Sequence, residues 1–231
     1  MNQEVTKCDC KECMLRPLFF DNIEDKDLKN VCNSKHEKSF IKGDLICEEG
    51  EEIGDFMYLK SGLVKIFKKV NHNRDQIIKI ARPFDFVSML SVFSDTHYKY
   101  SITALEDSTV CYINLSAIKK LVNNNGRFAL NLLKNMSKNS DDLIDTSINI
   151  SKRNLRGRIA YVLIYFAEYI YKSNTFELPV SRKEIGEFIE MTTENVIRTL
   201  SEFRKDDIIK INGKIIEITD YNRLKQICDF G

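Results

Sequence analysis

A block near the C-terminus, residues 179–218, constrains the fold of this chain more than any other segment. It begins with Ser181-Arg-Lys-Glu184, which has the form of a helix capping box, and apolar residues then recur at helical spacing. A short break at Glu190-Met191 is followed by Thr192, a good N-cap, and by a second helical pattern that extends to about Asp206. Two short helices joined this tightly predict a helix-turn-helix.

The second helix of this block has an apolar face and a polar face. At about 100° per residue its apolar side chains fall within a narrow sector. The polar side chains on the opposite face are Glu194, Arg198, Ser201 and Lys205. The apolar runs 208–211 and 214–218 then flank Asn212-Gly213, the residue pair that favours a type I′ turn, and they predict a β-hairpin. A helix-turn-helix followed by a hairpin is a winged helix.

The polar face of the second helix suits double-stranded DNA as a ligand. An arginine such as Arg198 can donate two hydrogen bonds to guanine, and a carboxylate such as Glu194 can accept one from cytosine. Thr193 and Ser201 are placed for contacts with phosphates or base edges, and Lys205 for a phosphate contact. The alternative is a winged helix used for protein contacts, in which Glu194 and Arg198 form only an i,i+4 surface pair.

Residues 39–113 show a different pattern, in which many short apolar runs are separated by closely spaced turn formers. This pattern predicts a β-sandwich or β-barrel. The predicted strands are Phe56–Leu59, Leu63–Phe67, Ile77–Ile80 and Thr109–Ile113, and the predicted turns lie at 42–44, 49–51, 60–62, 71–73 and 82–85.

From Arg127 to about Ile150 the chain contains no Gly or Pro, and its apolar spacing becomes helical. Some positions step by four and three along one line, as in the seam of a coiled coil. This line is Leu132, Met136, Asn139, Leu143, Thr146 and Ile150. Either a second copy of the helix or the helix's own domain could cover it. The basic run 152–158 follows, and then a second helix through Tyr171.

Composition narrows the class of protein. The 35 Lys and Arg against 34 Asp and Glu give a formal net charge of +1, so DNA binding would depend on where the charges lie. No segment approaches the roughly 20 apolar residues of a membrane helix, and the N-terminus lacks the pattern of a secretory signal. We therefore expect a soluble, cytoplasmic protein with no membrane partner. An enzyme is not expected, because the sequence contains three His and shows no phosphate-binding loop, nucleophile elbow or paired-acid motif.

The chain has seven cysteines, an odd number that argues against a disulfide scaffold in a large protein without a signal peptide. Cys8, Cys10 and Cys13 lie within six residues. A zinc site is one explanation, with Cys10 and Cys13 joined by Cys32 and His36. Against it, Cys32 shares a helical apolar face with Leu28 and Val31, which favours a place in the core.

The C-terminal block resembles the recognition motif of the CRP/FNR family of bacterial transcription regulators, and the likeness extends from about residue 15 to 227. It rests on Val180–Gly186 and Met191–Arg198, where Glu194 and Arg198 occupy the family's two base-reading positions. Further matches are Gly157-Arg-Ile-Ala160, where the DNA-binding domain begins, and the β-roll turns at Gly50 and Gly62. Two positions differ. Ile197 replaces a Ser of FNR-type members, and Glu190 replaces a turn Gly of many members.

The resemblance implies an α+β fold with three parts. Residues 1–125 would form a β-roll or jelly roll like that of cyclic-nucleotide-binding domains, 126–151 a dimerisation helix, and 152–231 a winged helix-turn-helix. It also implies a homodimer that binds a palindromic DNA operator and acts on RNA polymerase. A second function to weigh is a cyclic-nucleotide-binding-like regulatory subunit that acts through protein contacts, and sequence-selective DNA binding would distinguish the two.

The resemblance also indicates two places where a signal would act. Members that bind cAMP carry Gly-Glu-Leu and, about ten residues later, Arg-Ser. Here Ser88-Met89-Leu90 and the region of Lys99 replace them, so the ribose-binding acid and the phosphate-binding Arg are both missing. The sequence therefore argues against cAMP and leaves another acidic ligand near Ser88, Met89 and Lys99, or a solvated surface lysine.

FNR proteins hold a [4Fe–4S] cluster on three N-terminal cysteines and one in the β-roll. By resemblance, Cys8, Cys10, Cys13 and Cys111 would be the ligands here, and oxygen or nitric oxide the signal. The C-x-C-x2-C spacing is tighter than that of FNR. The alternatives are the zinc site and no metal at all, with Cys111 a small buried apolar residue in a strand.

Overall fold

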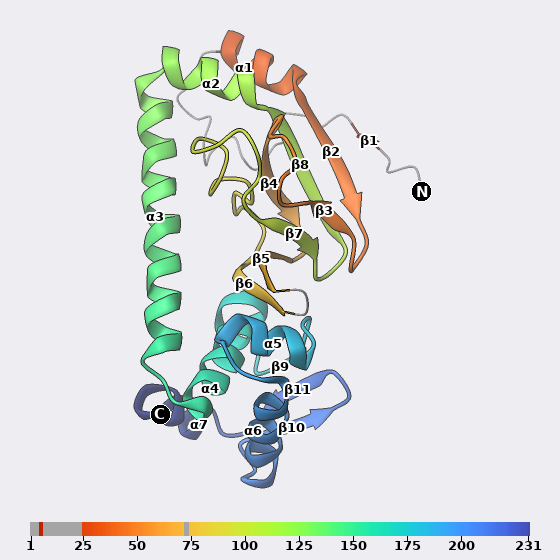
Figure 1. Cartoon of the computed structure of the whole chain (residues 1–231), viewed down its shortest axis with the longest axis vertical. Coiled ribbons are helices and arrows are strands. Elements are labelled where there is room, and N and C mark those ends of the chain that lie inside the picture. The colour runs from red at the N-terminus through yellow and green to blue at the C-terminus, as the bar shows by residue number, and fades with distance from the viewer. Residues whose placement is uncertain (1–4, 7–24, 72–73) are drawn as a thin grey trace. The chain divides into compact units, whose positions relative to one another are not determined.

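A computed structural model describes residues 5–6, 25–71 and 74–231 of the chain. The chain divides into two compact units. One is drawn from Met1–Lys68 and Ile78–Asp141, the other from Lys69–Ile77 and Asp142–Gly231. Strands dominate the first unit and helices the second, with the long helix α3 shared between them (Figure 1).

The first unit contains two four-stranded sheets, with strand orders β1-β2-β8-β4 and β3-β7-β5-β6. β8 pairs with β2 and β4, and β7 with β3 and β5, each time antiparallel. Apolar side chains from these strands form one hydrophobic core, which confirms the predicted β-rich unit. The strands are β1 Val5–Thr6, β2 Lys35–Phe40, β3 Leu45–Cys47, β4 Asp55–Ser61, β5 Val64–Asn71, β6 Arg74–Ala81, β7 Ser101–Ala104 and β8 Ser108–Asn114.

Several of the predicted turns are present. Those at 42–44, 49–51 and 82–85 are closed by backbone hydrogen bonds, and 71–73 extends beyond the described residues. The turn at 60–62 requires glycine, because Gly62 has φ +88°. A Cβ at Gly62 would also collide with the carbonyl oxygen of Asp107 and the hydroxyl of Ser108.

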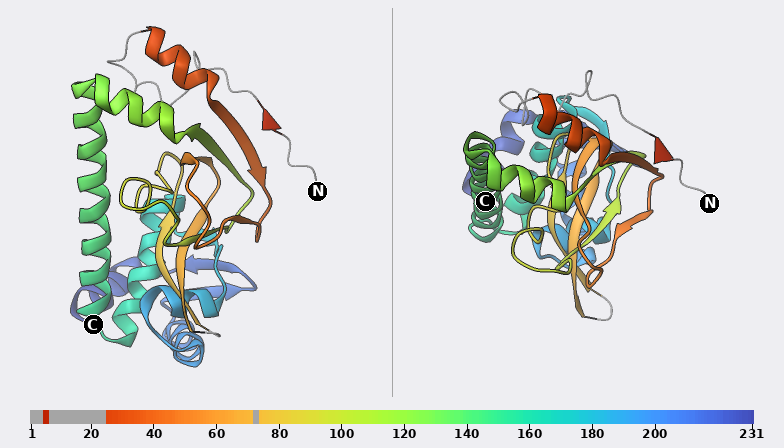
Figure 2. Two further views of the ribbon diagram at one scale, coloured as in Figure 1. Left: turned by 45° about the horizontal axis from the view of Figure 1, so that its top comes forward. Right: turned by 90° about the horizontal axis from the view of Figure 1, so that it is seen from above.

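α1 (Asp25–Asn33) lies before β2 in the chain, and α2 (Leu115–Asn124) and α3 (Gly126–Ser151) follow β8. The left view of Figure 2 shows α2 turning sharply into α3. The predicted line of apolar positions on α3 faces the helix's own chain. Leu132 and Ile150 are buried, Met136 packs against the core, and the side-chain oxygen of Asn139 accepts a hydrogen bond from Lys79 Nζ at 2.6 Å. Leu132 and Met136 agree with the alternative of packing on the helix's own domain, and the coiled-coil seam stays a prediction.

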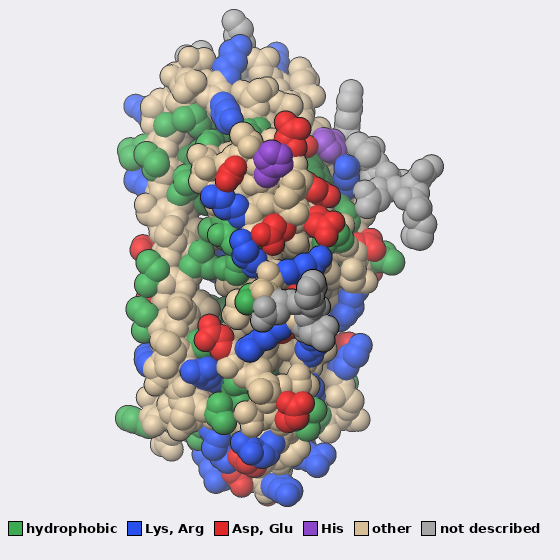
Figure 3. All heavy atoms as spheres, viewed as in Figure 1, with side chains coloured by type: hydrophobic (Ala, Val, Ile, Leu, Met, Phe, Trp, Pro, Cys, Tyr) green, Lys and Arg blue, Asp and Glu red, His purple; other side chains and the backbone are tan. Residues whose placement is uncertain are grey.

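A second apolar stripe lies elsewhere on α3. Leu130, Leu133, Ile144 and Ile148 are 54%, 58%, 56% and 51% exposed, respectively. At about 100° per residue these four lie roughly 100–160° around the helix from Leu132 and Ile150. Figure 3 shows apolar side chains along the outer edge of α3. The helix is therefore apolar on two faces, of which one is covered by its own chain.

The second unit combines helices with a three-stranded sheet of order β10-β11-β9. α4 continues into a π-helical turn, η2, so the predicted helix through Tyr171 is confirmed. Its elements after α3 are α4 Leu155–Tyr165, η2 Phe166–Tyr171, β9 Thr175–Glu177, α5 Arg182–Ile189, α6 Thr193–Lys205, β10 Ile209–Asn212, β11 Ile215–Ile218 and α7 Tyr221–Phe230. Across the described residues, no helix has the length and apolar character needed to span a bilayer.

The hairpin β10–β11 is present, but its predicted turn was wrong. Asn212 pairs with Ile215, so the two loop residues are Gly213 and Lys214 rather than Asn212 and Gly213. Gly213 has φ +61° and Lys214 does not share the positive φ, which matches a type II′ turn. The register places Ile209 opposite Ile218, and both are buried. Packing of the isoleucines therefore decides the register, as one face of the hairpin is buried.

Candidate nucleic-acid interface

The helix-turn-helix consists of α5 and α6, and local side chains fix the start of each helix. The capping box is confirmed: the backbone N–H of Ser181 donates to the Glu184 carboxylate at 2.8 Å, and that of Glu184 donates to the Ser181 hydroxyl oxygen at 3.2 Å. The Thr192 cap is confirmed as well, because its hydroxyl oxygen accepts from the backbone N–H of Asn195 at 3.3 Å. Both helix starts are thus encoded locally.

The turn between the helices depends on a close approach at Gly186. A Cβ at this residue would lie 2.6 Å from the carbonyl oxygen of Met191, well inside van der Waals contact. The backbone N–H of Met191 donates to the carbonyl oxygen of Gly186 at 2.9 Å. α5 ends at Glu190 in the left-handed conformation, with φ +57° and ψ +46°. Glutamate thus keeps a turn that suits glycine, at a conformational cost.

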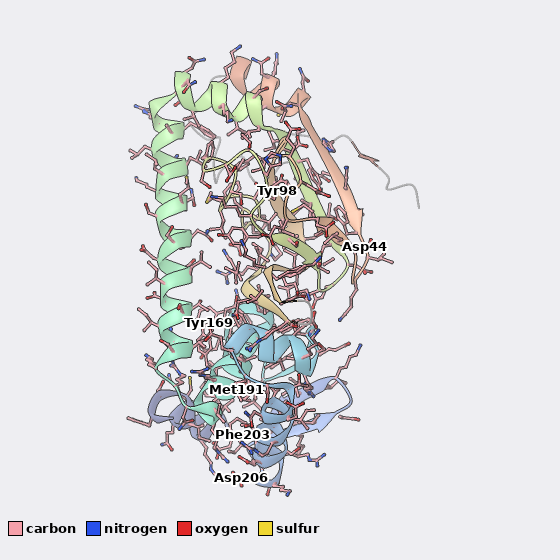
Figure 4. The ribbon with its side chains drawn as sticks, in the orientation of Figure 1. Asp44, Tyr98, Tyr169, Met191, Phe203 and Asp206 are labelled. Atoms are coloured by element: carbon pink, nitrogen blue, oxygen red, sulfur yellow. The ribbon has the colours of Figure 1, made fainter. Side chains whose placement is uncertain are left out.

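The two faces predicted for α6 are confirmed. Val196, Leu200 and Phe203 are buried against the rest of the unit. Figure 4 labels Met191 near the turn, and Phe203 and Asp206 toward the other end of α6. In Figure 3, Lys and Arg side chains gather over α6, with acidic side chains among them.

The predicted DNA-contacting residues lie along the outward part of α6. Glu194, Arg198 and Lys205 are exposed, whereas Thr193 and Ser201 are half-buried. They are spread from the first turn of the helix to its last. A helix that presents its polar side to solvent in this way has the dimensions to enter a major groove.

The carboxylate of Glu194 is held at the start of α6. Hydrogen bonds from its own backbone N–H and from the Thr192 hydroxyl keep its pKa below the ordinary value. The group is therefore charged at neutral pH and acts only as an acceptor. Such a group can accept from the amino group of cytosine.

Arg198 is 62% exposed and forms a loose ion pair with Glu202, with 3.9 Å between Nε and Oε1. The surface pair weighed in the protein-contact alternative joined Arg198 to Glu194. In the structure the carboxylate near Arg198 is that of Glu202, one turn after Arg198 on α6, rather than that of Glu194, one turn before it.

The basic run 152–158 makes structural contacts that the sequence analysis did not predict. Arg153 is buried, and its guanidinium donates to the carbonyl oxygens of Cys228 and Asn149, at 2.6 Å in both cases. Arg158 donates to the carbonyl oxygen of Ile189 at 3.1 Å, at the end of α5. These arginines hold α3, α5 and α7 to the start of α4.

Arg156, in the same run, binds α6 directly. Its two terminal nitrogens meet Glu202 at 2.9 Å and Asp206 at 2.8 Å, and its guanidinium lies over the Phe203 ring at 4.9 Å. The ion pair lowers the pKa of Asp206. The run of four basic residues without an acid beside them indicates that their partners lie elsewhere in the chain. The partners of Arg156, Glu202 and Asp206, are 46 and 50 residues away in the sequence, so the run alone does not identify them.

The residues predicted for an effector pocket belong to one region of the first unit. Ser88 and Met89 are buried, and the Ser88 hydroxyl oxygen accepts from the backbone N–H of Met57 at 2.8 Å. The backbone N–H of Lys99 donates to the hydroxyl of nearby Ser91 at 3.1 Å. The Lys99 ammonium pairs with Asp95 at 3.2 Å and is about half exposed. The Ser88 hydroxyl and the Lys99 charge thus both have partners within the chain.

Of the four predicted cluster ligands, Cys8, Cys10 and Cys13 lie outside the described residues. Cys111 lies in the middle of β8, opposite Glu37 and Tyr58, and has no exposed surface. This environment agrees with the alternative of a small buried apolar residue.

The zinc alternative also includes Cys32 and His36 of the described part, and it is wrong for Cys32, which is disulfide-bonded and therefore offers no thiolate to a metal ion. There, His36 stacks on the Tyr112 ring, with centroids 5.0 Å apart and planes at 10°. Among the residues with assigned positions, no three or more His, Cys, Asp or Glu are grouped to hold a metal ion. The described residues alone therefore do not fit a metal centre.

Two family models match the chain. The model described as "Cyclic nucleotide-binding domain" matches residues 37–125, from β2 through α2. The model described as "Crp-like helix-turn-helix domain" matches residues 157–227, from α4 into α7.

Curated relatives cover nearly the whole chain. The transcriptional activator protein Anr of Pseudomonas protegens is 27% identical over 218 residues, which are 91% of this chain and 88% of the relative. The fumarate and nitrate reduction regulatory protein of Escherichia coli K12 is 26% identical over 227 residues, 94% and 89% of the two chains. These relatives are regulators by name, in agreement with the expectation that the chain is not an enzyme.

Solved structures share the fold. FixK2 from Bradyrhizobium japonicum gives a TM-score of 0.73 at 23% identity, covering 83% of this chain and 96% of that one. A putative regulator of the crp/fnr family from Eubacterium rectale gives 0.77 at 18% identity, covering 91% and 97%. The predicted fold class, a β-rich N-terminal domain, a long helix and a C-terminal helix-turn-helix, is confirmed.

Proposed function

Since the chain belongs to the CRP/FNR family of transcription regulators, we propose that it reads one specific DNA operator with the exposed face of α6. One observation carries the proposal. α6 is capped at its start and buried along one side, and it presents Glu194, Arg198 and Lys205 to solvent. As a chromosome-binding regulator the protein acts in the cytoplasm.

Each exposed residue has a role that follows from its chemistry. Arg198 reads guanine through two hydrogen bonds, and Glu194 accepts from a cytosine amino group. Lys205, with Thr193 and Ser201, contacts phosphates and sets the register of the helix on DNA. Because Ile197 stands where FNR-type members carry Ser, the operator is expected to differ from theirs at the base beside it.

The experiment is selection of DNA by the full-length protein from a randomised double-stranded library. The expected product is an enriched sequence with a G·C pair at equivalent positions of two inverted half-sites. A library that shows no enriched sequence after repeated rounds would contradict the proposal, and would revive a regulatory subunit acting through protein contacts. The comparisons do not favour that second function, because the matched C-terminal model is a helix-turn-helix domain.

We further propose a homodimer formed by α3. The exposed stripe of Leu130, Leu133, Ile144 and Ile148 supports it, because exposed apolar stripes on long helices mark interaction surfaces. A helix of 26 residues offers about 39 Å of length to a second copy. A two-fold dimer also explains a palindromic operator, with half-sites about one helical turn apart.

Ile144→Glu tests this interface. A carboxylate in the buried seam should raise the dimer dissociation constant by about tenfold or more, measured by sedimentation. Ile41→Glu is the matched control, because Ile41 is equally exposed, at 55%, and lies outside α3. Equal sedimentation of both variants would contradict the proposed seam.

For the signal that the protein senses we propose two candidates. Neither is cAMP, because the acid and the arginine that bind cAMP in other family members are missing here. One is an acidic ligand near Ser88, Met89 and Lys99. The other is a [4Fe–4S] cluster on Cys8, Cys10, Cys13 and Cys111, which when bound would supply sensitivity to oxygen or nitric oxide.

Iron and sulfide assays with an absorbance spectrum, on protein purified without oxygen, separate the two candidates. Broad absorbance that bleaches in air, with iron and sulfide present, would support the cluster. A folded protein without iron or sulfide would overturn it and leave the acidic ligand.

As a regulator the protein would act on RNA polymerase as an activator, the role printed in the name of the Pseudomonas protegens relative.

A further inference from the structure

Glu202 lies between two arginines. One carboxylate oxygen, Oε2, is 2.9 Å from Nη1 of Arg156, and the other, Oε1, is 3.9 Å from Nε of Arg198. Arg156 belongs to α4, whereas Arg198 and Glu202 are one turn apart on α6. The carboxylate therefore connects the arginine assigned to base reading with a neighbouring helix.

Arg156 is itself held firmly. Its second terminal nitrogen is 2.8 Å from Asp206, and its guanidinium stacks over Phe203, which is fully buried. A guanidinium bound by two carboxylates and an aromatic ring has few alternative positions. Glu202 is thus fixed by a group that cannot follow Arg198 when Arg198 moves.

The contact with Arg198 leaves the base-reading atoms usable. It is made through Nε, so the two terminal nitrogens remain those that can donate to a base edge. A carboxylate 3.9 Å from Nε favours the rotamers of Arg198 that keep the two charges close, on a side chain that is 62% exposed. Restricting a rotamer-rich side chain before binding reduces the entropy lost when it contacts its partner.

We propose that Glu202, held by Arg156, is a positioning residue that sets the base selectivity of Arg198 without touching DNA. The inference rests on the proposed function. It predicts that Glu202 has opposite effects on two quantities, the preference of Arg198 for its base and the affinity for DNA of any sequence. As a positioning group it should favour the correct base, and as a negative charge on a DNA-facing helix it should weaken binding to DNA of any sequence. A residue that only stabilised the fold would not show this opposition.

The test is Glu202→Gln in the full-length protein, which keeps the side-chain shape and removes the charge. The probes are the duplex selected from the randomised library, its single-base variants, and a random duplex. The preference for the selected base at the Arg198 position should fall about 3- to 10-fold, because an immobilised side chain accounts for roughly that factor. Affinity for the random duplex should stay the same or increase.

Asp207→Asn is the matched control. It removes the same charge close to the end of α6, at an exposed residue that is not among the described ion-pair partners of Arg156 or Arg198, and Asn tolerates the positive φ of this position. Base preference should stay within about twofold of wild type, since the contacts that position Glu202 and Arg198 are kept. An equal fall in both variants would overturn the inference, because the effect would then come from the charge alone.

A double-mutant cycle with Arg198→Ala completes the test. In the Arg198→Ala background, Glu202→Gln should have no further effect on base preference. A further fall would overturn the inference, because Glu202 would then act by another route. Failure of the proposed function has a different result: the wild-type protein would select no sequence at all.

Discussion

The two units of the chain use their polar side chains differently. In the second unit, α6 exposes Glu194, Arg198 and Lys205. In the first unit, the hydroxyl of Ser88 already accepts a hydrogen bond from Met57, and Lys99 is paired with Asp95. The surface proposed to read DNA is therefore preformed in the free chain, whereas an effector that used Ser88 would first have to break a hydrogen bond of the fold.

The largest effect is expected where the reading surface is held together. Gly186→Ala should lower the free energy of unfolding by about 2–3 kcal/mol and reduce operator binding, because the added methyl group meets the carbonyl oxygen of Met191. Denaturant unfolding with DNA titration measures both. Gly54→Ala in the first unit is the control, since a Cβ there has nothing within 4 Å. Equal stability of the two variants would contradict the tight turn.

A smaller effect is expected for the bonded hydroxyl of the first unit. Ser88→Ala should cost about 1–2 kcal/mol of stability, because the backbone N–H of Met57 loses its buried acceptor. Operator affinity of the folded protein should not change. Ser94→Ala is the control, because the exposed Ser94 hydroxyl donates only at 3.3 Å or more. If Ser88→Ala is as stable as the wild type, the Ser88 hydroxyl is not needed by the fold and is available to a ligand. The contrast between the exposed side chains of α6 and the bonded hydroxyl of the first unit would then be lost.

The smallest effect has the opposite sign. Glu190→Gly should raise stability by about 0.5–1 kcal/mol, because glycine adopts the left-handed conformation of this turn without a Cβ penalty. Lys225→Gly, at an exposed position inside α7, should lower stability by a similar amount. Hydrogen exchange of the amides from α4 to α7 measures both changes. A loss of stability in Glu190→Gly would show that the glutamate makes a compensating contact.

Local patterns allowed much of the second unit to be predicted. The capping box at Ser181, the cap at Thr192 and the two faces of α6 depend on residues within one or two turns of each other. The hairpin turn was misassigned because its register is set by burial of isoleucines, which a turn dipeptide does not report. The ion pairs of Arg156 were missed because the partners are distant in sequence.

The long helix shows a different limit. α3 carries apolar residues on two faces, and the more regular spacing belongs to the face that packs on its own chain, at Leu132 and Met136. Periodicity identifies an apolar stripe but not what covers it. The irregular stripe that includes Leu133 and Ile144 became evident only from exposure.

Binding of two variants to the selected operator and to a random duplex, at one salt concentration, shows whether α6 reads DNA through Arg198. Arg198→Ala should lose about 1–3 kcal/mol of binding free energy on the operator, relax one base position, and change binding to the random duplex little. Lys205→Ala should weaken binding to both duplexes about equally, because it removes a phosphate contact. Equal losses of Arg198→Ala on the two duplexes would mean that Arg198 reads no base.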